Sequence, residues 1–176
     1  MSERFEYYII NDDTFRVVAD NDWYAQTFTP ALVHKITSVK LRLAVIGLPG
    51  DLTVSIKATD GEGKPTLGDL CFGTTDADTL TNDFAGEWRE IALGAGFDLE
   101  VDTKYAIVVR LLGGDASNKV LWRGDFSSAT YPGGEYLESA NSGGTWTAVS
   151  AYDFMFEEWG EGEAVAKARS YGFIFG

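Results

Sequence analysis

The sequence predicts an all-β fold, an antiparallel two-sheet β-sandwich in a single domain with extensions at both ends. Three observations carry this prediction. Apolar and polar residues alternate in several short segments, 20 glycines supply turns between them, and only residues 161–170 have a helical pattern. One helix cannot cover a parallel sheet, so two antiparallel sheets are expected to pack face to face. The chain of 176 residues can bury about two-thirds of its unfolded surface in one core.

The clearest two-residue alternation occurs in four segments, which are ITSVKLRLAV (36–45), LTVSIKAT (52–59), KYAIVVRLL (104–112) and YDFMFEEW (152–159). Side chains of a strand point alternately to opposite faces, so each segment is expected to be apolar on its inner face and wet on its outer face. In the last segment, Phe154 and Phe156 are expected to point inward, and Asp153 and Met155 outward.

Weaker strand patterns fill the rest of the chain. They cover residues 5–10, 14–18, 23–29, 88–93, 119–122, 135–138 and 145–149. Turn signals separate them, namely LPGD (48–51), DGEG (60–63), GGD (113–115), PGG (132–134) and NSGG (141–144). No internal repeat or interdomain linker interrupts this series, which supports one sandwich of many short strands.

Charge and composition limit the partners and the cellular compartment that we expect for this chain. The net charge of −13 repels phosphate backbones and anionic lipid headgroups, so we expect neither a nucleic-acid nor a membrane partner. No apolar run reaches the roughly 18 residues that a membrane helix needs. The first residues, MSERFEYYIINDD, do not resemble a signal peptide, and the single cysteine allows no intrachain disulfide. We therefore expect the chain to fold in the cytoplasm.

Residues for catalysis are sparse. His34 is the only histidine and precedes a strand, where an ordinary surface residue is expected. Cys71 lies between Leu70 and Phe72 and is expected to be a small core or strand residue. The sequence holds no GxSxG, P-loop, HExxH or CxxC motif, so no catalytic residue is assigned and the chain is not expected to be an enzyme. A hydrolase with a clustered acid pair is the least favoured alternative.

Two further features are candidate binding motifs. The acidic turns DDT (12–14), DND (20–22) and TTDAD (74–78) lack EF-hand spacing and are expected to be solvated. A structural calcium ion is the alternative. No metal ligand or cofactor is assigned. Arg123, Gly124 and Asp125 form an RGD tripeptide, for which chance is the better explanation.

Aromatic residues supply the candidate binding surface. Tyr131, Tyr136 and Trp146 lie in the Gly-rich segment ATYPGGEYLESANSGGTWT, where we expect outward presentation. Flat aromatic surfaces stack on sugar rings and anchor protein interfaces. The C-terminal SYGFIFG carries a second set, which is expected either to complete a terminal strand or to dock on a neighbouring subunit. Its members are Tyr171, Phe173, Ile174 and Phe175.

Several segments, taken in order, resemble a broad group of jelly-roll β-sandwich modules. The segments are WYAQTFTP, ITSVKLRLAVIGLPGDLTVSIKATDGEGKPTLGDL, WREIAL, FDLEVDTKYAIVVRL and GGTWT followed by YDFMFEEWG. That group occurs in bacterial and archaeal surface proteins, including choice-of-anchor domains, and in structural proteins of tailed phages. The resemblance covers residues 23–160 and implies a jelly roll there, flanked by an N-terminal extension or edge strands (1–22) and a C-terminal tail (161–176). It implies no catalytic residues, since fold alone does not set function.

The commoner members of that group are parts of long secreted chains, whereas this chain is short and its first residues are not expected to form a leader. The sequence therefore predicts a non-enzymatic structural protein of a tailed-phage virion, assembled in the host cytoplasm and placed on the virion surface. Capsid decoration or an accessory tail or fibre role is expected, with capsid or tail proteins of the same particle as partners. A homo-oligomer is compatible with such a role. A carbohydrate-binding or adhesion module, with a glycan as its partner, is the alternative.

Overall fold

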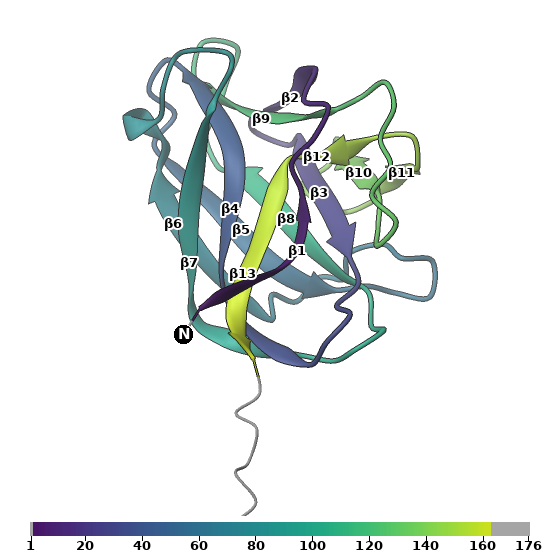
Figure 1. Ribbon diagram of the computed structural model, residues 1–176. Helices are drawn as coiled ribbons and strands as arrows, with labels where there is room; N and C mark the ends of the chain where they lie inside the picture. Colours follow the sequence, from purple (N-terminus) through teal and green to yellow (C-terminus); the bar gives the residue numbers. More distant parts are fainter. Residues whose placement is uncertain (1, 163–176) are drawn as a thin grey trace, which may run out of the picture.

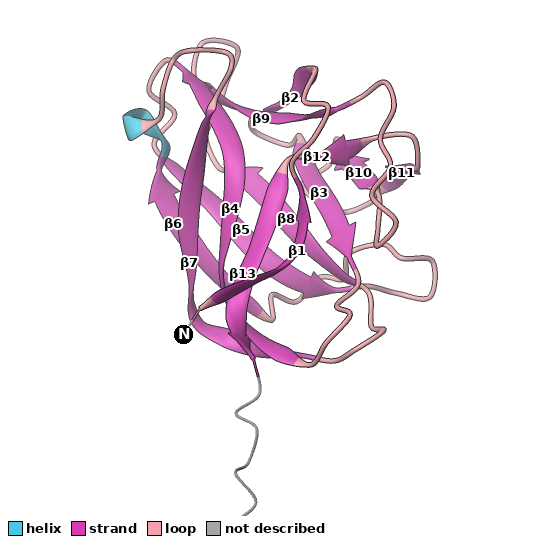
Figure 2. Cartoon of the chain, in the orientation of Figure 1, coloured by secondary structure: helices cyan, strands magenta, loops and turns pink. Residues whose placement is uncertain are grey.

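The computed structural model describes residues 2–162 and confirms an all-β fold of two antiparallel sheets (Figures 1 and 2). The seven-stranded sheet contains β1 (Glu3–Tyr8), β2 (Thr14–Val18), β4 (His34–Ile46), β7 (Glu87–Leu99), β9 (Lys119–Asp125), β12 (Asp153–Phe154) and β13 (Phe156–Gly162). The six-stranded sheet contains β3 (Trp23–Phe28), β5 (Asp51–Ala58), β6 (Cys71–Asp76), β8 (Tyr105–Leu111), β10 (Tyr136–Ser139) and β11 (Thr147–Val149). The single described helix is the short 3-10 helix η1 (Ala77–Thr79).

The long strand β4 organises the seven-stranded sheet. One edge of β4 pairs with β7, and the other edge pairs first with β13 and then with β9. The chain from β12 to β13 lies in the fork where β4 and β9 separate, since β12 pairs with β9 and β13 with β4. The terminal strand β1 pairs with β13, and β2 pairs with β9. The six-stranded sheet has the order β11-β10-β3-β8-β5-β6.

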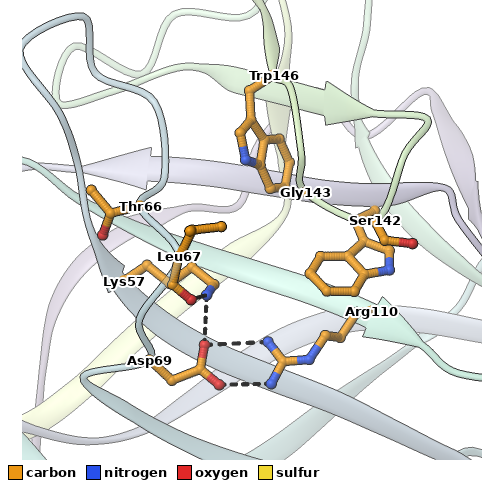
Figure 3. A pocket seen from close by; sticks show the side chains of 9 residues that line it. Lys57, Thr66, Leu67, Asp69, Arg110, Ser142, Gly143 and Trp146 are labelled. Carbon is orange, nitrogen blue, oxygen red and sulfur yellow. Dashed lines mark hydrogen bonds and ion pairs between the residues drawn. The ribbon is translucent and has the colours of Figure 1, made fainter.

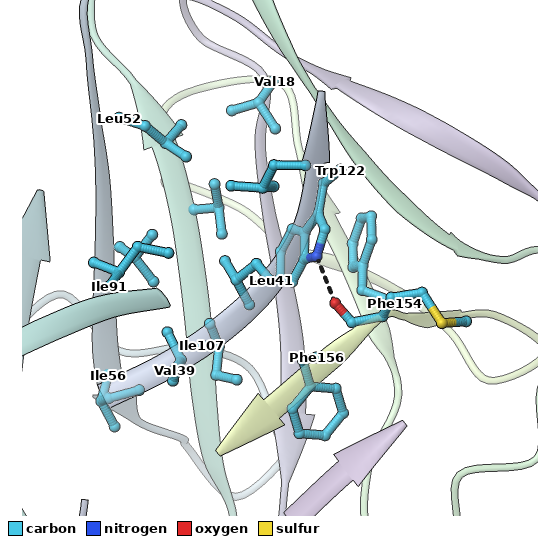
Figure 4. Packing of buried hydrophobic residues seen from close by; sticks show 14 of the residues in the cluster. Val18, Val39, Leu41, Leu52, Ile56, Ile91, Ile107, Trp122, Phe154 and Phe156 are labelled. Carbon is cyan, nitrogen blue, oxygen red and sulfur yellow. Dashed lines mark hydrogen bonds between the residues drawn. The ribbon is translucent and has the colours of Figure 1, made fainter. Parts of the chain in front are cut away.

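The predicted apolar faces form one core between the sheets (Figure 4). Val39, Leu41 and Leu43 of β4 are fully buried, as the alternation predicts. The largest buried side chain, Trp122, stacks on Phe154 with ring centroids 3.8 Å apart and an interplanar angle of 7°. Each buried large apolar side chain stabilises the fold by about 1.5–3 kcal/mol.

The fork changes the predicted orientation of the last strand. Asp153 and Met155 are buried together with Phe154 and Phe156, so the expectation that Asp153 and Met155 face solvent is wrong. The strand pairing is interrupted at Met155, between β12 and β13. Hydrogen bonds to its carboxyl group from Gln26 Nε2 (2.9 Å) and from the Tyr131 backbone N–H (3.0 Å) offset the cost of burying Asp153.

The outer face of the six-stranded sheet is also less exposed to solvent than the alternation predicts. Ser55 and Lys57 of β5 are buried, as are Ala106 and Val108 of β8. Trp146, in the segment between β10 and β11, packs on the two β8 side chains. Chain segments therefore cover part of a face that a simple sandwich would leave to solvent.

The chain ends belong to the sandwich as far as the structure describes them. Within residues 1–22, β1 and β2 are strands of the seven-stranded sheet, and Tyr8 and Val18 enter the core. Of the segment 161–170 with the helical pattern, residues 161 and 162 are the end of β13. The remainder of that segment, and Tyr171, Phe173, Ile174 and Phe175 of the predicted tail, lie outside the described residues.

Candidate functional site

A pocket of about 280 Å³ opens on the outer face of the six-stranded sheet (Figure 3). Its floor comes from β3, β5 and β8, and its two rims come from residues 66–69 and 142–146. The lining residues are Trp23, Lys57, Thr66, Leu67, Asp69, Arg110, Ser142, Gly143 and Trp146. Mixed apolar and charged side chains in a concave site are typical of ligand-binding pockets.

Three charged side chains form a network along one wall of the pocket. Asp69 Oδ1 accepts a hydrogen bond from Lys57 Nζ at 2.7 Å, and Asp69 Oδ2 accepts one from Arg110 Nη2 at 2.7 Å. Burial alone would raise the pKa of Asp69, but the hydrogen bonds from Arg110 and Lys57 outweigh it and hold that pKa below its ordinary value. The carboxylate is therefore ionised at neutral pH and fixes both cations in place.

The strand register explains how these cations meet. Lys57 on β5 lies opposite Ala106 of β8, and Arg110 on β8 lies opposite Thr53 of β5. Both cations therefore point to the outer face of the sheet. The loop that leaves β5 returns over this face, where Leu67 contributes its carbonyl oxygen to Lys57 Nζ at 2.7 Å. The opening between this loop and the β10–β11 segment is the pocket.

A glycine turn sets the position of the pocket's tryptophans. Gly143 has φ +80°, and a Cβ at this position would lie 3.0 Å from the Trp23 ring and 3.5 Å from the Trp146 ring. The absence of a side chain lets the turn lie against both indoles. Ser139 Oγ accepts a hydrogen bond from the Gly143 N–H at 2.9 Å and holds the turn on β10. The Arg110 guanidinium carbon lies 5.4 Å from the Trp23 ring centroid.

The structure places the three predicted aromatic residues apart from one another, and their expected outward presentation is wrong for two of them. Tyr136 is fully buried and packs against Phe154 in the core, and Trp146 is only 8% exposed. Tyr131 is half-buried, and its hydroxyl donates a hydrogen bond to Glu6 at 2.8 Å. Of the three, only Trp146 lines the pocket. Tyr136 is buried because the Gly-rich segment contains a strand, β10, of the sheet itself.

The sequence alone does not predict that Trp23, Lys57, Asp69 and Arg110 lie together in one pocket. The segment KYAIVVRLL does indicate that this face is covered. Ala106 and Val108 lie on the face that was expected to be exposed to solvent, and both are apolar. Strands that are apolar on both faces are covered on both faces.

His34 is not a surface residue, contrary to the expectation. It is 1% exposed, and its Nε2 lies 2.9 and 2.8 Å from the two carboxylate oxygens of buried Glu158. Burial lowers the pKa of His34, but the hydrogen bond and charge of Glu158 outweigh it and raise that pKa above its ordinary value. The pair is enclosed beneath β1 and is not part of the pocket lining.

Two other sequence features have structural roles. Cys71 is buried in β6, as expected, and burial raises the pKa of its thiol to about 11. The RGD tripeptide lies within β9 rather than in a loop. Arg123 Nη2 is 2.8 Å from Asp12, and Asp125 is fully buried. The tripeptide is therefore not presented to a receptor, in agreement with its interpretation as chance.

The acidic turns use their carboxylates to hold the backbone. Asp60 Oδ1 accepts hydrogen bonds from the N–H groups of Glu62 and Lys64, and Asp76 Oδ1 accepts one from Asp78. Within residues 2–162, no group of three or more His, Cys, Asp and Glu side chains could hold a metal ion. Calcium binding therefore stays a prediction without an identified site in the described part of the chain.

No family model, curated protein or solved structure matches the chain. No helix within the described residues is long and apolar enough to cross a membrane. The function of the chain is therefore inferred from the pocket and from the surface of the sandwich.

Proposed function

We propose that this protein is a non-enzymatic structural component of a tailed-phage virion, a capsid decoration protein or an accessory tail or fibre protein. It is assembled in the host cytoplasm and then lies on the virion surface, bound to capsid or tail proteins of the same particle. The observation that supports it best is the free edge of β1. Within residues 2–162, β1 pairs with β13 only, so its other edge offers unpaired backbone groups to a neighbouring subunit.

Exposed apolar side chains accompany this edge. Tyr7, Ile9 and Ile10, which we call the β1 patch, are 45%, 38% and 53% exposed. They lie at the end of β1 and directly after it. A cluster of exposed apolar groups beside an unpaired strand is typical of a protein interface. The β1 patch is therefore our candidate contact with the particle.

The strand order supports the jelly-roll resemblance. We propose that β2-β9-β4-β7 and β3-β8-β5-β6 are the two four-stranded halves of a jelly roll, which has eight strands in two sheets. On this interpretation, β1 and β12–β13 are additions to one half, and β10–β11 extend the other. The free edge of β1, which we propose as the contact with the particle, then belongs to these added strands.

Such a body acts by shape. The two sheets share one closely packed core, so the sandwich is stiff and holds its contact surfaces in a fixed arrangement. Copies on a symmetric particle attach through many weak contacts, whose combined strength exceeds that of one contact. The net charge of −13 keeps the assembled particle soluble.

The first test is the protein content of particles. Particles purified by density gradient from the cells that make this chain are analysed by mass spectrometry. We expect the chain at a fixed ratio to the major capsid or tail protein. Particles that form normally and lack the chain would overturn the proposal.

A second test locates the contact. Tyr7→Asp and Ile10→Asp place charges in the β1 patch and should abolish particle association while the purified variants remain folded. Leu112→Asp is the matched control, since Leu112 is 72% exposed and lies outside the patch. A tail truncation must keep residues through 162, because β13 pairs with β4 up to Gly162. Normal association of both patch variants would reject the β1 patch as the contact.

A further inference from the structure

We propose that the pocket on the six-stranded sheet binds one unit of an acidic saccharide, a sugar residue that carries a carboxylate. This binding role goes beyond attachment to a particle and does not depend on it. Three properties of the pocket support the proposal: its apolar wall, its charge and its size.

Two indoles give the pocket an apolar wall. Trp146 closes one end of the pocket (Figure 3). Trp23 also lines the pocket, and both indoles lie against the Gly143 turn. The C–H groups of a sugar ring pack favourably against indole surfaces, while its hydroxyls need polar partners. Trp23 Nε1 is also the one buried side-chain polar atom within residues 2–162 that has no hydrogen-bond partner. Because this atom is enclosed by the protein, a ligand cannot reach it, and the two indoles contribute apolar surface to the pocket.

The charge of the pocket favours an anion. Lys57 and Arg110 are the cations of the lining and Asp69 is its only acid, which leaves one excess positive charge. This excess stands out in a chain whose net charge is −13. The side chain of Lys57 is only 6% exposed, so solvent screens its charge weakly. A ligand carboxylate would share the cations with Asp69 and balance the excess charge.

The size of the site fits a saccharide chain. The volume of about 280 Å³ suits a single sugar ring and excludes a folded protein segment. A neighbouring hollow of about 600 Å³ shares Thr66, Leu67, Gly143 and Trp146 with the pocket. One sugar unit in the pocket therefore leaves room for the following units along residues 60–67. A terminal acidic sugar in the pocket, with its chain in the hollow, is the arrangement that the geometry favours.

The binding test uses the full chain and defined probes. Oligosaccharides that end in glucuronic, galacturonic or N-acetylneuraminic acid are compared with neutral counterparts that end in glucose or galactose, by calorimetric titration. We expect binding of at least one acidic probe that weakens as salt is added. Equal or tighter binding of the neutral counterparts would overturn the acidic assignment. No binding of any probe would overturn the site.

Matched variants locate the binding. Leu67 and Leu48 are 89% and 71% exposed, and only Leu67 lines the pocket. We expect Leu67→Asp to weaken acidic-probe binding about threefold, because a like charge then stands at the rim. Leu48→Asp, with the same change of net charge, should bind as the wild type does. Equal affinities of the two variants would overturn the location.

A second pair tests the cation itself. Arg110→Gln should weaken binding about tenfold or more by removing a charge-assisted hydrogen bond. Arg89→Gln, on the seven-stranded sheet, makes the same charge change outside the pocket. Thermal unfolding of each variant checks that the fold is intact. Particle association should persist in all four variants, so failure of this proposal and failure of the attachment role are distinguishable.

Discussion

His34 and Glu158 face each other without solvent access, 124 positions apart in the sequence, with Nε2 of the histidine 2.8 Å from the nearer carboxylate oxygen. Nδ1 of His34 lies 2.8 Å from the carbonyl oxygen of Leu32 and donates its proton there. One further proton is then shared between Nε2 and the Glu158 carboxylate. Phe5 stacks on the imidazole at 3.7 Å, so β1 covers the pair.

The first prediction concerns this pair. His34→Ala leaves the Glu158 carboxylate buried without its partner, and we expect it to lower the free energy of unfolding by about 3–5 kcal/mol. Urea denaturation at pH 7, followed by tryptophan fluorescence, measures the change. Lys40→Ala is the control, because Lys40 is 3.9 Å from exposed Glu90 and such surface pairs contribute at most about 1 kcal/mol. A loss for His34→Ala as small as the control's would contradict the prediction.

The second prediction is a pH dependence that arises from Asp153. Burial raises the pKa of this carboxyl to about 6, despite hydrogen bonds from Gln26 and Tyr131 that lower it. The folded protein therefore binds a proton more tightly than the unfolded chain. The resulting stability is fully present below the unfolded-state pKa of about 4 and is lost as the pH rises through about 6. One proton gives a slope of at most about 1.4 kcal/mol per pH unit.

Urea titrations between pH 4.5 and 7.5 test this slope against Asp153→Asn. The raised pKa values of His34 and Glu158 act in the same direction, since both groups also hold protons more tightly in the folded state. The difference between wild type and variant isolates the Asp153 contribution. We expect a flatter curve for the variant, and parallel curves would show that Asp153 does not titrate in this range.

The third prediction concerns the fork between β4 and β9. Trp122 Nε1 donates a hydrogen bond to the Met155 carbonyl oxygen at 3.1 Å. We expect Trp122→Ala to cost about 3–5 kcal/mol by opening a cavity. Trp122→Phe should cost about 1–3 kcal/mol, because it leaves this carbonyl unpaired.

Trp88→Phe provides the matched control for Trp122. Trp88 is 39% exposed, so its replacement should change stability by at most about 0.5 kcal/mol. Chemical denaturation of the three variants gives the comparison. Equal losses for Trp88→Phe and Trp122→Phe would contradict the assigned role of the indole hydrogen bond.

The fourth prediction concerns the contact between the edge strands β6 and β7. A Cβ on Gly73 would lie 1.9 Å from the carbonyl oxygen of Ala92, so only glycine allows the two backbones to approach this closely. We expect Gly73→Ala to lower the melting temperature and to cost about 1–3 kcal/mol or more. Gly61→Ala has open space and is the control. A Gly73→Ala variant as stable as the control would show that the edges can separate freely.

Much of the fold could be predicted because alternation is a local property. The strands around Val39, Leu52 and Ile107 repeat apolar residues at every second position, and each is a strand of the structure. The strand Cys71–Asp76 was not identified, because its sequence CFGTTD has little alternation and its position is at a sheet edge. Edge strands bury one side poorly, so selection for a clear apolar pattern is weaker there.

The candidate site was predicted less well. Trp146 is part of the pocket, whereas Tyr136 is a core residue that shares its Gly-rich surroundings. Local composition does not distinguish a tyrosine in a short strand from a tryptophan in the following turn. From the sequence, Lys57 and Arg110 are ordinary outward-facing strand residues. Only the folded structure places the loop with Asp69 above them and pairs both cations with its carboxylate.

The amino-acid sequence by itself determined most of the strands and the two-layered, all-β class, because alternation and turn residues act between near neighbours in the chain. Only the tertiary structure decided which polar groups are buried and paired. Asp69 meets Arg110 across 41 positions, and His34 meets Glu158 across 124. Antiparallel strand pairing brings such distant residues together, and the free energy of burying a charge depends on those partners rather than on its neighbours in sequence.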